Sequence, residues 1–74
     1  MTQVGDLFSR RRFEKRLEET RGSLYRMAYA WCHNRYLAED LVQQTMLKAL
    51  EKRNQLRELE RLESWVYRIL ANTF

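Results

Sequence analysis

Proline is absent from this sequence, and glycine occurs only twice, at Gly5 and Gly22. Tight turns between strands depend on these two residue types, because glycine tolerates positive φ angles and proline presets a turn conformation. A sheet protein with several hairpins is therefore excluded in practice. The sequence predicts an all-α protein, and its 74 residues suffice for a single small domain.

Long apolar runs are also missing. The longest covers residues 27–32, which is far too short to cross a bilayer. No charged start followed by an apolar stretch marks a signal peptide. The single cysteine cannot form an internal disulfide, which fits a reducing compartment. We therefore expect a cytoplasmic protein that does not use a membrane.

Catalytic and metal-binding patterns are absent as well. Cys32 and His33 are adjacent, so on a helix they point about 100° apart and cannot easily share a metal. We expect Cys32 to be a small core residue and His33 a cation at the end of a helix. The pair Glu39 and Asp40 fits a helix start or a partner contact better than acid–base catalysis. The sequence thus predicts no enzyme, no metal and no cofactor.

Positive charge is in modest excess. Lysine and arginine number 14 against 10 acidic residues, a net charge of +4. The excess is spread along the chain, at +2 over residues 1–21 and +1 over each of 22–52 and 53–74. Eleven of the cations are arginine, which binds phosphate with two hydrogen bonds and stacks on bases. The arginine content points to nucleic acid or an acidic partner, but on composition alone a solvated helical surface of mixed charge is the preferred explanation.

Apolar residues recur at helical spacing in three segments. In the first segment, Asp6 is positioned to cap the helix, and Gly22 predicts a bend or a break. The helix should end at His33-Asn34, because asparagine tolerates the left-handed conformation found at helix ends. The expected inner face of this segment consists of Phe13, Leu17, Leu24, Ala28 and Trp31.

A second helix is expected from about Leu37 to Lys52, with Glu39-Asp40 in its first turn and Lys48 near its end. Its inner face should hold Val42, Met46, Ala49 and Leu50, flanked by Ala38 and Thr45. A second, mostly polar face consists of Asp40, Gln43, Gln44 and Leu47.

A third segment ends the sequence. Leu62, Trp65, Val66, Ile69 and Leu70 form its apolar stripe. The preceding residues 53–63 contain no strong helix breaker except an asparagine, so propensity alone would merge them into one long helix.

Two motifs in these segments resemble a known family. Ala38-Glu39-Asp40-Leu41-Val42-Gln43-Gln44-Thr45, followed by Lys48-Ala49, resembles the second helix of region two of bacterial sigma factors. About twenty residues later, Ser64-Trp65-Val66-Tyr67-Arg68-Ile69-Leu70-Ala71-Asn72 resembles the promoter-recognition helix of that region, and residues 24–28 resemble its first helix. The similarity is greatest to the extracytoplasmic-function class.

The resemblance implies a compact region-two domain of three or four helices over residues 10–74, with a flexible start at residues 1–9. It implies a transcription-initiation function, with RNA polymerase core as a partner through the clamp coiled coil of the largest subunit. It also implies binding of promoter DNA, through the non-template strand of the minus-ten element, and regulation by an anti-sigma factor. The DNA-binding region four of such proteins is absent from this sequence.

Residue roles follow from the same resemblance. The polymerase-binding residues would be Glu39, Asp40, Gln43, Gln44 and Leu47. In the DNA-binding set, Leu56 and Ile69 would wall a base pocket, and Asn72 would read the base. Arg57, Arg61 and Arg68 would hold phosphates, and Tyr67 would be exposed. Trp65 would lie at the junction of duplex and single strand, although its place in the apolar stripe equally fits the core.

Three positions depart from the family pattern. Gln44 stands where glutamate is common, Val66 replaces the second tryptophan of primary sigma factors, and residues 55–63 lack the usual Gly, Pro or Phe of the loop. The loop therefore either orders as an extra turn or is mobile until DNA binds. The alternative function is a helical protein-interaction module without DNA binding. A membrane-surface protein is disfavoured because acidic residues interrupt the cationic faces.

Overall fold

The computed structural model describes the backbone of residues 2–74 and the side chains of residues 10–74. Three α-helices follow one another: α1 (Thr2–Cys32), α2 (Arg35–Glu51) and α3 (Leu62–Thr73). Two single-turn 3₁₀ helices, η1 (Arg53–Gln55) and η2 (Leu59–Arg61), connect α2 to α3. No strand occurs in residues 2–74, so the predicted all-α class is confirmed.

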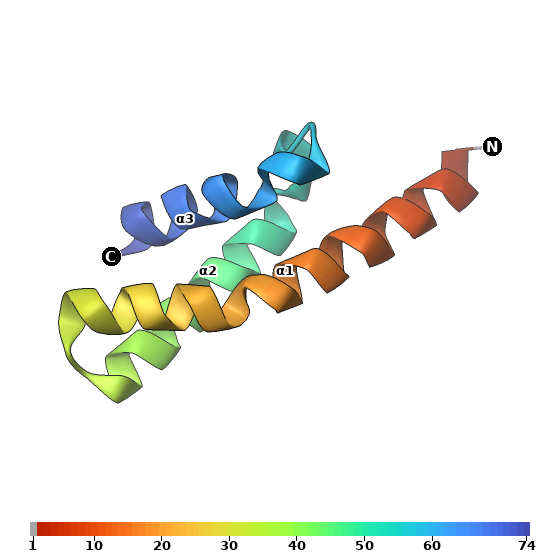
Figure 1. The fold of residues 1–74 in the computed structure, drawn as a ribbon. Helices are drawn as coiled ribbons and strands as arrows, with labels where there is room; N and C mark the ends of the chain where they lie inside the picture. Colours follow the sequence, from red (N-terminus) through yellow and green to blue (C-terminus); the bar gives the residue numbers. More distant parts are fainter. Residues whose placement is uncertain (1) are drawn as a thin grey trace.

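The three helices share one apolar core. Each helix contributes a buried stripe at the expected spacing, and α2 and α3 both pack against α1 (Figure 1). The largest fully buried side chains are those of Leu17, Leu24, Leu62, Leu70, Val66 and Thr45. The hydroxyl of Thr45 donates to the carbonyl of Leu41 at 2.7 Å, so burial of this side chain does not leave a polar group without a hydrogen bond.

Helix α1 is longer than the part of the domain formed by α2 and α3. Its 31 residues span about 47 Å, at 1.5 Å per residue. Figure 1 shows the red N-terminal part of α1 extending past the ends of α2 and α3. The predicted break at Gly22 is wrong, since α1 continues through it, although Figure 1 shows a slight change of axis direction in the orange middle of the helix. Thr20 lies there, buried, and donates to the carbonyl of Arg16 at 2.9 Å, a bond that often bends helices.

A two-residue turn joins α1 to α2. His33 has a φ of 54°, so the left-handed residue is His33 and not Asn34 as expected. Asn34 instead caps α2, because its Oδ1 accepts the Leu37 backbone N–H at 2.9 Å. Helix α2 therefore begins at Arg35, and Glu39 and Asp40 lie beyond its first turn, contrary to the prediction.

Three side-chain predictions change. Trp31 was expected in the core, but it is 40% exposed and packs its ring on Phe74, with centroids 5.4 Å apart. Leu41 of α2 is buried and was not predicted to be. Tyr67 was expected to be exposed, whereas it is half-buried against the core. Cys32 is also half-buried against the core, near its expected position.

Two predictions concern the start of the chain. Helix α1 begins at Thr2, so Asp6 lies inside the helix and is not at the position of an N-terminal cap. The sequence also predicts a flexible start over residues 1–9. Met1 and the side chains of residues 2–9 lie outside the described part, so this flexibility stays a prediction.

Candidate functional site

The outer face of α2 is the first group of predicted residues. Glu39, Asp40, Gln43, Gln44 and Leu47 are all exposed, on the side of α2 opposite its buried stripe. Gln44 donates from Nε2 to Asp40 Oδ2 at 2.6 Å, one helical turn away. This bond holds the amide and the carboxylate next to each other on the exposed side of α2. Leu47, which is 55% exposed, adds an apolar contact beside them. We call these five residues the α2 face.

The second group surrounds a depression between the η1–η2 connection and the first turns of α3. Its volume is about 370 Å³, within the range of ordinary ligand pockets. We call it the 55–68 depression, and its lining residues are Gln55, Leu56, Arg57, Glu58, Arg61, Ser64, Trp65 and Arg68.

Local backbone conformation creates this depression. The chain leaves helical geometry after η1, since Leu56 and Glu58 both have extended backbone angles. Leu56 and Leu59 are half-buried against the core, and this packing pulls the connection back toward α1 and α2. Residues 53–63 do not merge into one long helix as propensity alone would favour, because burial of these leucines outweighs local propensity. Of the two conformations expected for the loop, the ordered extra turn is the one found.

Trp65 packs against the core and also lines the 55–68 depression. It is half-buried, and its indole meets the buried Phe13 ring edge-on, at a centroid distance of 5.9 Å and an interplanar angle of 70°. Edge-on aromatic pairs of this kind contribute about 0.5–1.5 kcal/mol beyond burial. The same indole lines the 55–68 depression. Trp65 is thus held by the core while part of its surface remains available to a ligand.

Arginine supplies the charge of the depression. Arg57, Arg61 and Arg68 all line it and are exposed. Arg61 donates from Nε to Glu58 Oε1 at 2.9 Å, with side chains 77% and 61% exposed. An ion pair this exposed contributes at most about 1 kcal/mol, so a phosphate could replace Glu58 at little cost. The three guanidinium groups therefore place positive charge beside Leu56 and Trp65 in the lining of the depression.

The remaining predicted DNA-binding residues lie outside the depression. Ile69 is 9% exposed, belongs to the core and does not line the depression, unlike Leu56, the other expected wall. Tyr67 also packs against the core. Asn72 is exposed and follows Arg68 by four residues, so it lies on the same face of α3, one turn beyond the depression.

Two contacts to other helices hold the turn that carries Asn72. Lys48 of α2 donates from Nζ to Thr73 Oγ1 at 3.1 Å, and Thr73 donates to the carbonyl of Ile69 at 2.8 Å. Phe74 packs on Trp31 of α1. Among the described side chains, the Lys48–Thr73 bond is the one side-chain hydrogen bond that joins two α-helices. The last turn of α3 is thereby fixed to both α1 and α2.

Sequence reasoning missed Gln55, Glu58 and Ser64 as lining residues. A carboxylate repels phosphate, so sequence reasoning did not assign Glu58 to a DNA-binding site. The structure shows that Glu58 pairs with Arg61 in the lining of the depression. Ser64 donates to the carbonyl of Arg61 at 3.2 Å and so helps the start of α3. Its position three residues after Arg61 was the only available signal, and it was too weak to separate Ser64 from other polar residues.

Comparison with known proteins decides the family. A family model described as Sigma-70 region 2 matches residues 17–74. The chain belongs to the sigma-70 region 2 family. This agrees with the motifs recognised in residues 38–49 and 64–72. In addition, the chain is 39% identical over 49 residues to a Bacillus subtilis (strain 168) protein described as RNA polymerase sigma factor SigV.

The aligned part amounts to 66% of this chain and 30% of that relative, so this sigma-70 region 2 domain corresponds to less than a third of the relative's length. No solved structure gives a significant match. Over the described residues, none of the sigma-70 region 2 helices has the length and apolar character needed to span a membrane.

Proposed function

We propose that this sigma-70 region 2 domain is a transcription-initiation module of the extracytoplasmic-function class. It binds RNA polymerase core through the α2 face and captures the melted non-template strand of the minus-ten element at the 55–68 depression. The domain acts by binding and catalyses no reaction. Both partners belong to the bacterial cytoplasm, which is therefore the proposed location.

The observation that carries this proposal is the composition of the depression. Five residues assigned to DNA from sequence motifs, Leu56, Arg57, Arg61, Trp65 and Arg68, line one hollow of about 370 Å³. Capture of an unstacked base requires an apolar or aromatic surface, since base–aromatic stacking contributes about 1–3 kcal/mol per base. It also requires cations at the rim to neutralise the backbone. Trp65 and Leu56 supply the first requirement and the arginines supply the second.

Asn72 is the proposed base reader. A carboxamide offers one acceptor and two donors, a pattern that can discriminate among base edges by about 1–3 kcal/mol. Its exposed position beside Arg68 and the fixed last turn of α3 support this role. Because Ile69 is buried, we propose that Leu56 and Trp65 form the walls, and Ile69 supports α3 from beneath.

Polymerase binding is assigned to the α2 face because its exposed side chains combine two carboxylates, two amides and one leucine. These groups can bond to arginines and polar side chains along a coiled coil, and the leucine adds buried apolar area. The neutral Gln44 makes this contact weaker than a glutamate would, since charge-assisted bonds are roughly twice as strong.

The test measures binding of single-stranded oligonucleotides that differ at single minus-ten positions, with and without polymerase core, over a range of salt concentrations. Asn72→Ala should reduce discrimination at one position and leave the salt dependence unchanged. Arg68→Ala should weaken binding to every oligonucleotide and flatten the salt dependence, because phosphate carries no sequence information. Binding to core without any preference for oligonucleotide sequence would favour a protein-interaction module instead.

A further inference from the structure

Net positive charge is concentrated in one short stretch of α1. Residues 10–16, Arg-Arg-Arg-Phe-Glu-Lys-Arg, contain five basic residues and one acidic residue, a charge of +4. This equals the net charge of the whole chain, because the other 67 residues hold nine residues of each sign. We call residues 10–16 the basic segment. Its charge is not apparent from residues 1–21 as a whole, which carry only +2.

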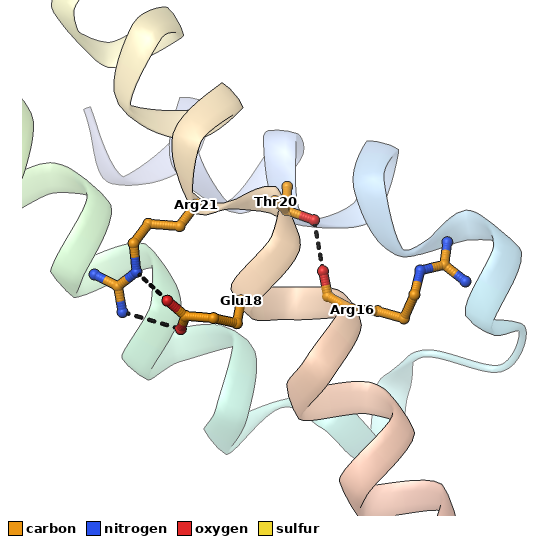
Figure 2. A network of polar contacts seen from close by, with 4 residues as sticks. All are labelled: Arg16, Glu18, Thr20 and Arg21. Atoms are coloured by element: carbon orange, nitrogen blue, oxygen red, sulfur yellow. Dashed lines mark hydrogen bonds and ion pairs between the residues drawn. The ribbon is translucent and has the colours of Figure 1, made fainter.

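The basic segment begins next to the 55–68 depression. Phe13 is buried and contacts Trp65, which lines the depression, at 5.9 Å between ring centroids. Arg12 and Arg16 lie on either side of Phe13 in the sequence, one turn apart on α1. In Figure 2 the side chain of Arg16 extends away from Thr20, in the direction of the light-blue start of α3. The segment therefore adjoins the depression through the contact of Phe13 with Trp65.

The cations of the segment face solvent. Arg10, Arg11, Arg12 and Lys15 are exposed, and Arg16 is half-buried. The two ion pairs found among side chains of residues 10–74 are Arg21–Glu18, drawn in Figure 2, and Arg61–Glu58, and neither uses these cations. Seven helical residues cover about 10 Å, a length over which duplex DNA presents about six phosphates. The charge density of the segment thus suits a duplex backbone.

We propose that the basic segment binds backbone phosphates of the double-stranded DNA that adjoins the strand held at the 55–68 depression. This proposal rests on the proposed function for the identity of the nucleic acid. Duplex DNA is the favoured occupant because the segment adjoins Trp65, which lines the depression proposed to hold DNA, and because arginine matches phosphate geometry. The contact carries no base information, so it adds affinity for any duplex sequence.

The test compares the parent chain with the triple variant Arg10→Gln, Arg11→Gln, Arg12→Gln. All three positions are exposed and helical, and glutamine is a good helix former, so the fold should be retained. A matched control, Arg26→Gln, Arg35→Gln, Lys52→Gln, removes the same charge from exposed positions elsewhere. The probes are a single-stranded minus-ten oligonucleotide, the same strand in a fork with an adjoining duplex, and a plain duplex.

The triple variant should lose affinity for the fork and for the plain duplex, and its logarithmic salt slope should flatten by up to about 2.7 for three lost phosphate contacts. Its affinity for the single-stranded oligonucleotide should stay within about twofold of the parent. The control should keep the parent's slope on all three probes. Equal slopes for parent and triple variant, or equal losses in the triple variant and the control, would overturn the proposal.

The experiment distinguishes failure of this proposal from failure of the proposed function. Failure of every protein to bind the single-stranded oligonucleotide would reject the base-capture proposal, whereas the plain duplex would still test the basic segment. If the triple variant instead weakens binding to polymerase core and leaves duplex binding unchanged, the segment contacts protein, and the proposal is wrong.

Discussion

One pair of leucine substitutions tests the division of this domain into core and binding face. Leu24 of α1 has no exposed surface, whereas Leu47 of α2 is 55% exposed. Both changes to alanine delete the same atoms from a helix, so intrinsic helix propensity affects them equally. Any difference in stability therefore reports burial alone.

The expected magnitude is large for a domain of this size. Replacement of a buried leucine by alanine costs about 2–5 kcal/mol, and native domains have about 0.05–0.15 kcal/mol of stability per residue. For a chain of 74 residues the total is then about 4–11 kcal/mol, so Leu24→Ala removes a large share of it. Leu47→Ala should change the free energy of unfolding by no more than about 0.5 kcal/mol.

Thermal and urea unfolding followed by circular dichroism measures both variants. Leu24→Ala should lower the melting temperature by at least about 8 °C, since each kcal/mol shifts a domain of this size by about 4–8 °C. Leu47→Ala should melt with the parent and bind polymerase core more weakly. Two variants that melt at the same temperature would refute the assignment of the inner and outer helix faces.

Three further predictions concern single contacts. Gly22→Ala should raise the free energy of unfolding by about 0.5–1 kcal/mol, because Gly22 lies inside α1 and a Cβ there meets its nearest neighbour, an Arg26 nitrogen, at 3.7 Å; urea unfolding measures it, and a loss of stability would contradict the continuous helix. Asn34→Ala should cost about 0.5–2 kcal/mol in the same assay, whereas Asn34→Asp keeps the cap; equal losses would show that the Oδ1 bond does not cap α2. Lys48→Met should reduce sequence discrimination by Asn72 in oligonucleotide competition and spare core binding, because it removes the bond to Thr73; unchanged discrimination would show that the last turn needs no such support.

The stripe of α3 could be predicted from sequence because it repeats cleanly. Leu62, Val66, Ile69 and Leu70 are buried as the spacing indicated, with Trp65 at the border. The same reasoning was wrong for Trp31, although it continues the stripe of Phe13. A side chain is buried only where a neighbouring helix covers it. Helix α1 has 31 residues and α3 has 12, so α3 cannot cover the whole length of α1. At the level of Trp31, Phe74 is the ring that reaches it, and the indole stays 40% exposed.

The turn between α1 and α2 could not be predicted residue by residue. Asparagine is favoured both in the left-handed conformation and as a helix N-cap. The sequence His33-Asn34 permits either use, and the structure places Asn34 at the cap and gives the positive φ to His33. The cap bond to Leu37, of about 0.5–2 kcal/mol, offsets the cost of a left-handed histidine, which is about 1–2 kcal/mol.

The candidate site depends on the part of the chain where local propensity fails. Residues 53–63 favour a helix, and a continued α2 would carry Leu56 and Leu59 away from the core. Their burial instead breaks the helix into η1 and η2 and reverses the chain. Because the chain reverses, Arg57 lines the 55–68 depression together with Arg61 and Trp65. Motifs could name these residues, but only tertiary packing, which no local pattern records, turns them into a concave surface beside Phe13 and the basic segment.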